Sequence, residues 1–303
     1  MPMPLRRVWF QIHLWIGLAA GLYIVMMSLS GSALVFRREL VQAFSPVQPS
    51  FDGDARMLSS DELRAAVLRA YSGYTVAHIG SVQRRSPVVE ISLARDGETI
   101  DRVFNAYTGE DLGDPFPAGA RALLWLADLH DDLLMGRGRG RFWNGIGSVL
   151  VTVLCVTGAL IWWRGARAWR RATVVSWREP WPRLAFDLHS ASGFWFLAML
   201  LVWAVSGIYL SFPAPFTRAV DAIWGSEPFG TRPGDVALEW LVRLHFGRWR
   251  SHTLKTVWVL VGLLPAIMFV TGAAMWWHRA VRRRRTSVRE HVPGFAGAPQ
   301  GIE

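Results

Sequence analysis

Four apolar runs of membrane-spanning length dominate this chain. They cover about residues 12–36, 146–163, 194–212 and 257–277, and a helix needs roughly 20 apolar residues to cross a bilayer. Hydrophobic residues make up 51% of the 303 residues, and 17 of the residues are Trp. This composition is typical of an integral membrane protein with aromatic belts at its interfaces. The sequence therefore predicts an all-α membrane bundle with four transmembrane helices.

Arginines set the expected orientation of these helices. The net charge is +10, and arginines gather before the first run, between the second and third, and after the fourth. By the positive-inside rule, both termini and the middle loop are cytoplasmic. The uneven charge thus indicates topology rather than nucleic-acid binding. We expect the first run to be retained, because its apolar stretch is too long for a signal peptide.

Cysteine usage excludes several kinds of site. Cys155 is the one cysteine, and it lies inside an apolar run. The chain therefore has no internal disulfide, no thiolate zinc site, no iron–sulfur ligation and no C-x-x-C-H attachment of c-type haem.

The segment between the first two runs, residues 37–120, is predicted to be a small α+β domain outside the membrane. Ser59 and Glu62 form a capping box that opens a helix to about residue 70. The Asp96-Gly97 pair predicts a hairpin turn. His78 lies on an expected strand, and we interpret it as structural. The stretches that alternate like strands are 75–81, 88–93 and 99–105.

The first and third apolar runs open with the same motif. In both, a Gly follows a His by four residues, and a Ser-Gly pair begins seventeen residues after the His. The copies are His13, Gly17 and Ser30-Gly31, and His189, Gly193 and Ser206-Gly207.

The second and fourth runs also match each other. A Trp precedes a Leu-His pair by four residues before each run, and each run finishes with Thr-Gly-Ala and Trp-Trp. The matched residues are Trp125, His130, Thr157-Gly158 and Trp162-Trp163, and Trp240, His245, Thr271-Gly272 and Trp276-Trp277. The chain is thus a duplicated two-helix unit, with the α+β domain inserted into the first copy. Two copies of the same orientation are related by an axis along the membrane normal.

The duplicated histidines predict the chemistry. Ionisable residues in a membrane are costly and default to a functional hypothesis. A pseudo-two-fold axis brings one His from each copy to opposite faces of a planar ligand, as bis-His haem b requires. We expect an inner pair, His13 and His189, at the cytoplasmic ends of their helices. We expect an outer pair, His130 and His245, near the opposite face. Iron ligated axially by protein on both sides passes electrons rather than binding oxygen.

Small residues are expected beside both haems. Gly17 and Gly193 lie on the same helix face as the inner histidines and would leave room for a macrocycle edge. The Ser-Gly pairs fall near the depth of the outer pair, and the Thr-Gly pairs near the depth of the inner pair. The alternative is that each His is an interfacial anchor and that the small residues serve helix packing.

Other histidines remain as reserves. His278 follows Trp277 at the cytoplasmic end and could replace a member of the inner pair. His252 has no counterpart in the first copy, and we place it at the outer rim. His291 lies in the basic tail, where we expect it to be solvated.

These motifs, together with Leu244-His245-Phe246-Gly247-Arg248, resemble the PepSY-associated transmembrane family. The turn 105–110 resembles the closing turn of a PepSY domain, although Asn105-Ala106 replaces the usual Asp-Pro. The resemblance covers nearly the whole chain. It implies a protein of the bacterial inner membrane. It also implies reduction of a ferric siderophore or other ferric chelate in the periplasm through two haem b groups.

The resemblance also implies an electron source, either the quinol pool or a cytoplasmic reductase. The chain shows no nucleotide-binding glycine motif, so we expect a separate donor. One alternative is a non-catalytic PepSY membrane module that binds or regulates a partner. Another is a permease, which usually has more spans and has broken helices at mid-membrane. We expect Pro265 to be the one proline well inside a span.

The predicted segments follow from these boundaries. They are 1–36, the first transmembrane helix; 37–120, the periplasmic PepSY-like domain; 121–163, an amphipathic segment and the second transmembrane helix; 164–188, a cytoplasmic loop; 189–212, the third transmembrane helix; 213–255, a periplasmic segment; 256–278, the fourth transmembrane helix; and 279–303, a basic tail.

Overall fold

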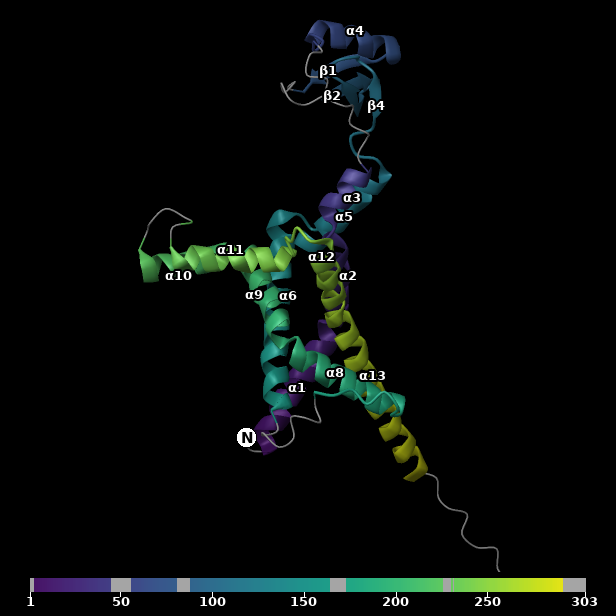
Figure 1. Cartoon of the computed structure of the whole chain (residues 1–303). Helices are drawn as coiled ribbons and strands as arrows, with labels where there is room; N and C mark the ends of the chain where they lie inside the picture. The colour runs from purple at the N-terminus through teal and green to yellow at the C-terminus, as the bar shows by residue number, and fades with distance from the viewer. Residues whose placement is uncertain are drawn as a thin grey trace, which may run out of the picture. The chain divides into compact units, whose positions relative to one another are not determined.

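A computed structural model of the chain describes residues 3–44, 56–80, 88–163, 173–225, 230 and 232–290 (Figure 1). The described residues form two compact units. One is Phe36–Ala127, which we call the inserted unit; the rest is the helical unit. His291 and the predicted loop arginines 164–171 lie outside the described residues, as do the side chains of 282–290.

The inserted unit contains a four-stranded antiparallel sheet with a helix, α4 (Ser60–Ala70), packed on it. Its core consists of six buried side chains: Leu63, Val67, Val89, Ile91, Leu93 and Phe104. The two contributions from α4 are four residues apart, so they share one helix face. The strands are β1 (Thr75–Ile79), β2 (Val88–Arg95), β3 (Glu98–Asn105) and β4 (Asp111–Gly113), in the spatial order β1-β2-β3-β4.

Local sequence signals in this unit are confirmed. The Ser59 hydroxyl accepts from the Glu62 N–H while the Glu62 carboxylate accepts from the Ser59 N–H, which is the predicted capping box. Asp96 and Gly97 both have positive φ, 53° and 83°, as a two-residue hairpin of the primed type requires. Strand β4 was missed, because its three residues are too short to show a period.

A polar cluster ties β4 to β3 and to the end of α4. Arg102 donates two hydrogen bonds to the Asp111 carboxylate, and the Tyr71 hydroxyl donates a third. Burial alone would raise the pKa of Asp111, but these hydrogen bonds outweigh it and lower the pKa. Burial, and then the hydrogen bond to Asp111, raise the pKa of Tyr71 to about 12. Tyr71 is therefore a neutral donor at every physiological pH.

The helical unit holds two helices long and apolar enough to cross a membrane, Arg137–Trp162 and His252–Val281. Two further pairs of helices pass the same criteria only together, because each pair is bent, by 61° and by 68°. With each bent pair counted as one span, four candidate spans result. The helices are α1 (Met3–Ala19), α2 (Gly21–Leu34), α6 (Arg137–Trp162), α8 (Trp181–Trp195), α9 (Leu197–Ser211), α12 (His252–Gly262) and α13 (Leu264–Glu290). Its shorter helices are α10 (Pro213–Trp224) and α11 (Pro233–Phe246), whereas α3 (Arg37–Phe44) belongs to the inserted unit and α5 (Ala118–Asp132) begins in that unit and ends in the helical one.

The prediction that the first and third runs are continuous helices was wrong. The breaks fall at Ala20 and Phe196, each seven residues after a motif histidine. Apolar composition indicates how long a span is, but it does not reveal a bend that forms without a proline. Gly21 follows the first break, where a Cβ would lie 1.8 Å from the Phe269 ring. Broken helices of the kind that permeases usually have therefore do occur among the described residues.

The fourth run is interrupted beside Pro265, and a distant serine repairs the interruption. Gly262 O and Ala266 N would form one bond of a regular α-helix. Instead Ser28 of α2 donates to Gly262 O at 2.6 Å and accepts from Ala266 N at 3.3 Å. In a membrane no water is present to satisfy such groups, so an inserted side chain has to.

The helices of the two copies exchange partners. Helix α6 packs against α1 and α9, and α13 packs against α8 and α2. In Figure 1, α6 lies along α9, and α13 runs beside α8. In each copy, the first half of the broken helix packs against that copy's own later helix. The second half packs against the later helix of the other copy, so the four spans form one bundle.

The Asp111 cluster predicts how acid acts on the inserted unit. A lowered folded pKa means that the carboxylate stabilises the fold above its unfolded pKa of about 3.9. That stabilisation is lost as the pH falls through the folded pKa. Asp111→Asn should cost about 1 kcal/mol at pH 7, since the pair is partly solvated, and should reduce the loss of stability below about pH 4. Urea unfolding against pH measures both effects.

Asp96→Asn is the matched control, because Asp96 is exposed on a turn where Asn is also tolerated. If Asp111→Asn and wild type lost the same unfolding free energy at low pH, the Asp111 carboxylate would not be the cause of that loss.

Candidate functional site

The structure brings the two inner histidines together. His13 of α1 and His189 of α8 have ring centres 6.2 Å apart, with the rings nearly perpendicular at 89°. His13 Nδ1 lies 3.0 Å from the Thr157 hydroxyl of α6. His189 Nδ1 lies 2.9 Å from the carbonyl of Met268 and 3.3 Å from the Thr271 hydroxyl of α13. Each ring is therefore contacted by a helix of the later run of its own copy, α6 for His13 and α13 for His189.

The outer histidines meet in the same way. His130 at the end of α5 and His245 at the end of α11 have ring centres 6.3 Å apart, at an angle of 59°. His130 Nδ1 lies 2.9 Å from the Ser30 hydroxyl of α2, and His245 Nδ1 lies 2.6 Å from the Ser206 hydroxyl of α9. Ser30 and Ser206 hold equivalent places in the two copies of the motif.

The hydroxyls decide which ring nitrogen bears the proton. A hydroxyl has one hydrogen, and Thr157 donates it to the carbonyl of Val153 at 2.7 Å. We therefore assign the Thr157 hydroxyl as the acceptor and His13 Nδ1 as the donor. The same holds at the outer pair, because Ser30 donates to Met26 O and Ser206 donates to Trp203 O.

The fourth histidine reaches the same tautomer more directly. His189 Nδ1 contacts the Met268 carbonyl, which has no hydrogen to give, so Nδ1 is the donor. In all four rings the lone pair is consequently on Nε2. A hydrogen bond from the other ring nitrogen is the usual way a protein fixes the tautomer and orientation of a metal-binding imidazole.

The ring-centre distances of both pairs equal the separation of two imidazoles on either side of a metal ion. Two metal–nitrogen bonds of about 2 Å, with each nitrogen ~1.1 Å from its ring centre, separate the ring centres by about 6 Å. No cluster of three or more His, Cys, Asp or Glu side chains suited to a metal ion occurs among the described residues. A metal held here would take its other ligands from a bound group, as haem iron does from its macrocycle.

Orphaned indole donors accompany the pairs. Within the described parts of the chain, the buried Nε1 atoms of Trp9, Trp162 and Trp249 have no acceptor. Trp9 lies one helical turn before His13, and Trp249 lies four residues after His245. Buried donors without partners are uncommon in native proteins. A bound group with carboxylates, such as haem propionates, would supply the missing acceptors.

Glycines approach three of the four rings. A Cβ at Gly31 would lie 2.8 Å from Cε1 of His130, and one at Gly158 would lie 3.2 Å from Cε1 of His13. At Gly272 the corresponding distance to His189 is 3.3 Å. Gly207 differs, because its nearest neighbour is Ser148. Gly17 and Gly193, which the sequence placed beside the inner ligand, face Leu154 and Met268 at 3.7 and 3.2 Å.

The remaining histidines form no such ring pair among the described residues. His78 is exposed on β1 of the inserted unit, and His252 is exposed at the first residue of α12. His278 lies on α13, and no ring contact with another histidine is found for it in the described residues.

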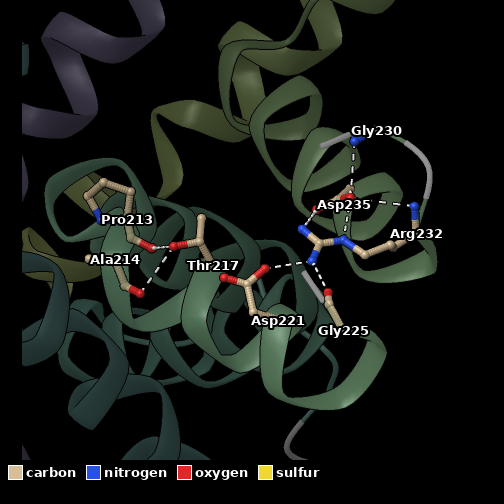
Figure 2. Close-up of polar contacts among 8 residues, drawn as sticks. All are labelled: Pro213, Ala214, Thr217, Asp221, Gly225, Gly230, Arg232 and Asp235. Carbon is tan, nitrogen blue, oxygen red and sulfur yellow. Dashed lines mark hydrogen bonds and ion pairs between the residues drawn. The ribbon is translucent and has the colours of Figure 1, made fainter. Parts of the chain in front are cut away.

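An ion-pair network positions the helix that carries His245 (Figure 2). Arg232 donates two hydrogen bonds to Asp235, one to Asp221 at 2.5 Å and one to the carbonyl of Gly225. Arg232 and Asp235 are buried. The hydrogen bonds from Arg232 lower the pKa of Asp235. The network joins the end of α10 to the start of α11 and so fixes the helix at the end opposite His245.

Sequence reasoning missed two features of this site. The Ser and Thr of the repeated pairs were interpreted only as small residues, although they also bond the rings. Their repetition as hydroxyl residues was the available signal, since Ala would be equally small. The Arg232 network could not be recognised in the sequence, because an Arg and an Asp three residues apart are also common on exposed helices.

Together the fold and its paired rings define a multi-pass membrane protein built by duplication, with lipid-facing helices and two histidine pairs. A family model described as PepSY-associated TM region matches residues 10–233 and 222–279. These matches span most of the chain, so the chain belongs to the PepSY-associated transmembrane family. No curated protein matches it.

Gly31 predicts a steric test of the outer pair. Gly31→Ala should displace the His130 ring, because the new Cβ would lie 2.8 Å from Cε1. Overpacking of this kind costs about 1–3 kcal/mol, which thermal unfolding of the purified protein would register as a lower midpoint. Gly138→Ala is the control, since a Cβ there meets open space. Equal midpoints for the two variants would contradict the close approach.

Proposed function

We propose that this protein holds two haem b groups in the bacterial inner membrane and passes electrons to a ferric chelate in the periplasm. The observation that carries the proposal is the pair of His–His contacts with all four Nε2 lone pairs left for a metal. His13 and His189 would hold one haem, and His130 and His245 the other. Both termini are then cytoplasmic, as the arginine distribution requires.

The residues of this chain perform binding and orientation. Thr157, Thr271 and the Met268 carbonyl keep the inner imidazoles in the ligating tautomer, and Ser30 and Ser206 do so for the outer ones. A hydrogen-bonded imidazole is a stronger ligand and loses less rotational freedom on binding.

When bound, the two haems would supply one-electron transfer between a donor and the ferric substrate. Each Fe³⁺ gains one electron and becomes Fe²⁺. A quinol that releases two electrons and two protons would support two such reductions; a cytoplasmic reductase is the other donor class. Reduction weakens binding by hard oxygen ligands, so the iron is released from the chelate for uptake.

The geometry favours this proposal over the two alternatives. A non-catalytic module that only binds a partner through the inserted unit has no need for four oriented imidazoles. A permease is compatible with broken helices, yet the breaks lie seven residues after the histidines rather than at them. Both alternatives predict a protein without haem, so haem content separates them from electron transfer.

Histidine variants test the ligand assignment. Wild type should hold two low-spin b haems per chain, and Ala at His13, His189, His130 or His245 should each remove one. The reduced-minus-oxidised visible spectrum and the haem count per chain measure this. His78→Ala is the control and should keep both haems. Two haems in all four ligand variants, or none in wild type expressed with ample haem, would refute the proposal.

The hydroxyl at position 157 provides a finer test. Thr157→Val keeps the side-chain shape but removes the acceptor for His13 Nδ1, so haem affinity at the inner pair should fall about 10–100-fold. Thr157→Ser should restore it. Haem titration of the haem-depleted protein measures the affinity. Thr152→Val is the control, because its hydroxyl bonds only the Ser148 carbonyl. Equal affinity in the Val and Ser variants would show that the hydroxyl does not act through the ring.

A further inference from the structure

Exposed arginines flank the outer histidine pair on two separate helix ends. One group lies in the first two turns of α6, after His130, and the other lies around His245 at the end of α11. We call them the arginine rim: Arg137, Arg139, Arg141, Arg243, Arg248 and Arg250, all of which are exposed.

The first turns of α6 rest directly on the residues around His130. Asn144 Nδ2 donates to the backbone carbonyls of His130 at 2.7 Å and of Asp131 at 3.1 Å. A Cβ at Gly140 would lie 1.7 Å from the carbonyl oxygen of Asp132, so the two backbones touch. This close approach places the first turns of α6, which bear three arginines of the rim, beside residues 130–132.

The chain turns back immediately after His245. Gly247 has φ 56°, and the Arg248 N–H donates to the carbonyl of Arg243, which is a Schellman closure. Arg243 lies over the Trp240 ring at 4.8 Å, and Arg248 lies over the Phe246 ring at 4.7 Å. Phe246 in turn contacts the His245 ring.

Nearby acidic residues compensate the charge of the rim only in part. The ion pairs formed among the described residues use other arginines, and the rim arginines take part in none of them. Four carboxylates lie nearby in sequence, against six arginines: Asp128, Asp131, Asp132 and Glu239. The first turn of α6 has no acidic residue, although the positive end of a helix dipole disfavours cations there. The positive-inside rule also disfavours arginines on this side.

We infer that the arginine rim binds ferric chelates of net negative charge beside the outer pair. The inference rests on the proposed function and names the substrate class of that site. Guanidinium groups bind carboxylate and similar oxyanions through paired hydrogen bonds. A positive surface also raises the local concentration and the association rate of an anion. One electron then reaches the ferric centre, and the transfer itself makes or breaks no covalent bond.

The test uses three ferric trihydroxamates that are identical around the iron. Their peripheral amine is free, acetylated or succinylated, so the chelates are positive, neutral and negative. Gallium(III) versions have the same charges but cannot be reduced, so calorimetry on the full chain in neutral-lipid nanodiscs measures binding alone. We expect the succinylated chelate to bind about tenfold tighter than the amine form at low salt, with the difference shrinking as salt rises.

The variant R137Q/R141Q/R248Q should lose this preference while keeping two haems. Arg178→Gln is the matched control, since Arg178 is exposed on the segment before α8, the helix of the inner pair, and it should leave the preference unchanged. Loss of a haem in the triple variant would show that the rim arginines bind haem propionates. If wild type showed no preference among the chelates but bound anionic phosphatidylglycerol vesicles, the rim would be a lipid-binding surface. Either result overturns the inference.

Electron transfer is followed separately. Dithionite-reduced protein is mixed anaerobically with each ferric chelate, and haem reoxidation is recorded. Reoxidation fastest with the succinylated chelate supports the inference and the proposed function together. If the gallium chelates bound with the expected charge dependence but no ferric chelate reoxidised the haem, the reductase proposal would be refuted. The proposed anion site would still be supported.

Discussion

The site depends on one kind of interaction, a hydrogen bond from a histidine Nδ1 to an oxygen that can only accept. Each hydroxyl concerned gives its hydrogen to the carbonyl one turn back in its own helix. That internal bond turns a group able to donate or accept into a fixed acceptor. The imidazole opposite is thereby fixed in tautomer and orientation. Four rings obey this rule, and the duplication of the chain explains why they do so in two matched pairs.

The breaks in the helices follow from the same need to satisfy polar groups where water is absent. Ser28 replaces a missing bond of the fourth run and so joins α2 to the junction of α12 and α13. The bends at Ala20 and Phe196 place α1 and α8, which bear the inner histidines, at an angle to the helices that follow them. Small residues then allow the close approaches that bring the rings together.

The two ends of the proposed electron path differ in character. The inner pair is held by helices of the bundle alone, whereas the outer pair comes from the ends of α5 and α11. Asn144 fixes the end of α5, whereas the Arg232 network fixes α11 at the end opposite His245 (Figure 2). An outer pair built from short helices, close to exposed arginines, suits a site where an external substrate must approach.

The sequence by itself determined the membrane class, the duplication, the inserted α+β unit with its capping box and hairpin, and the four repeated histidines as candidate ligands. These follow from composition, periodicity and repeated spacing, which are local properties of the chain. The tertiary structure alone decided which oxygens contact the histidine rings, where the first and third runs bend, and which carbonyl Ser28 bonds. The reason is physical: Ser28 meets Gly262 and His13 meets Thr157 across more than a hundred residues, and only packing brings such partners together.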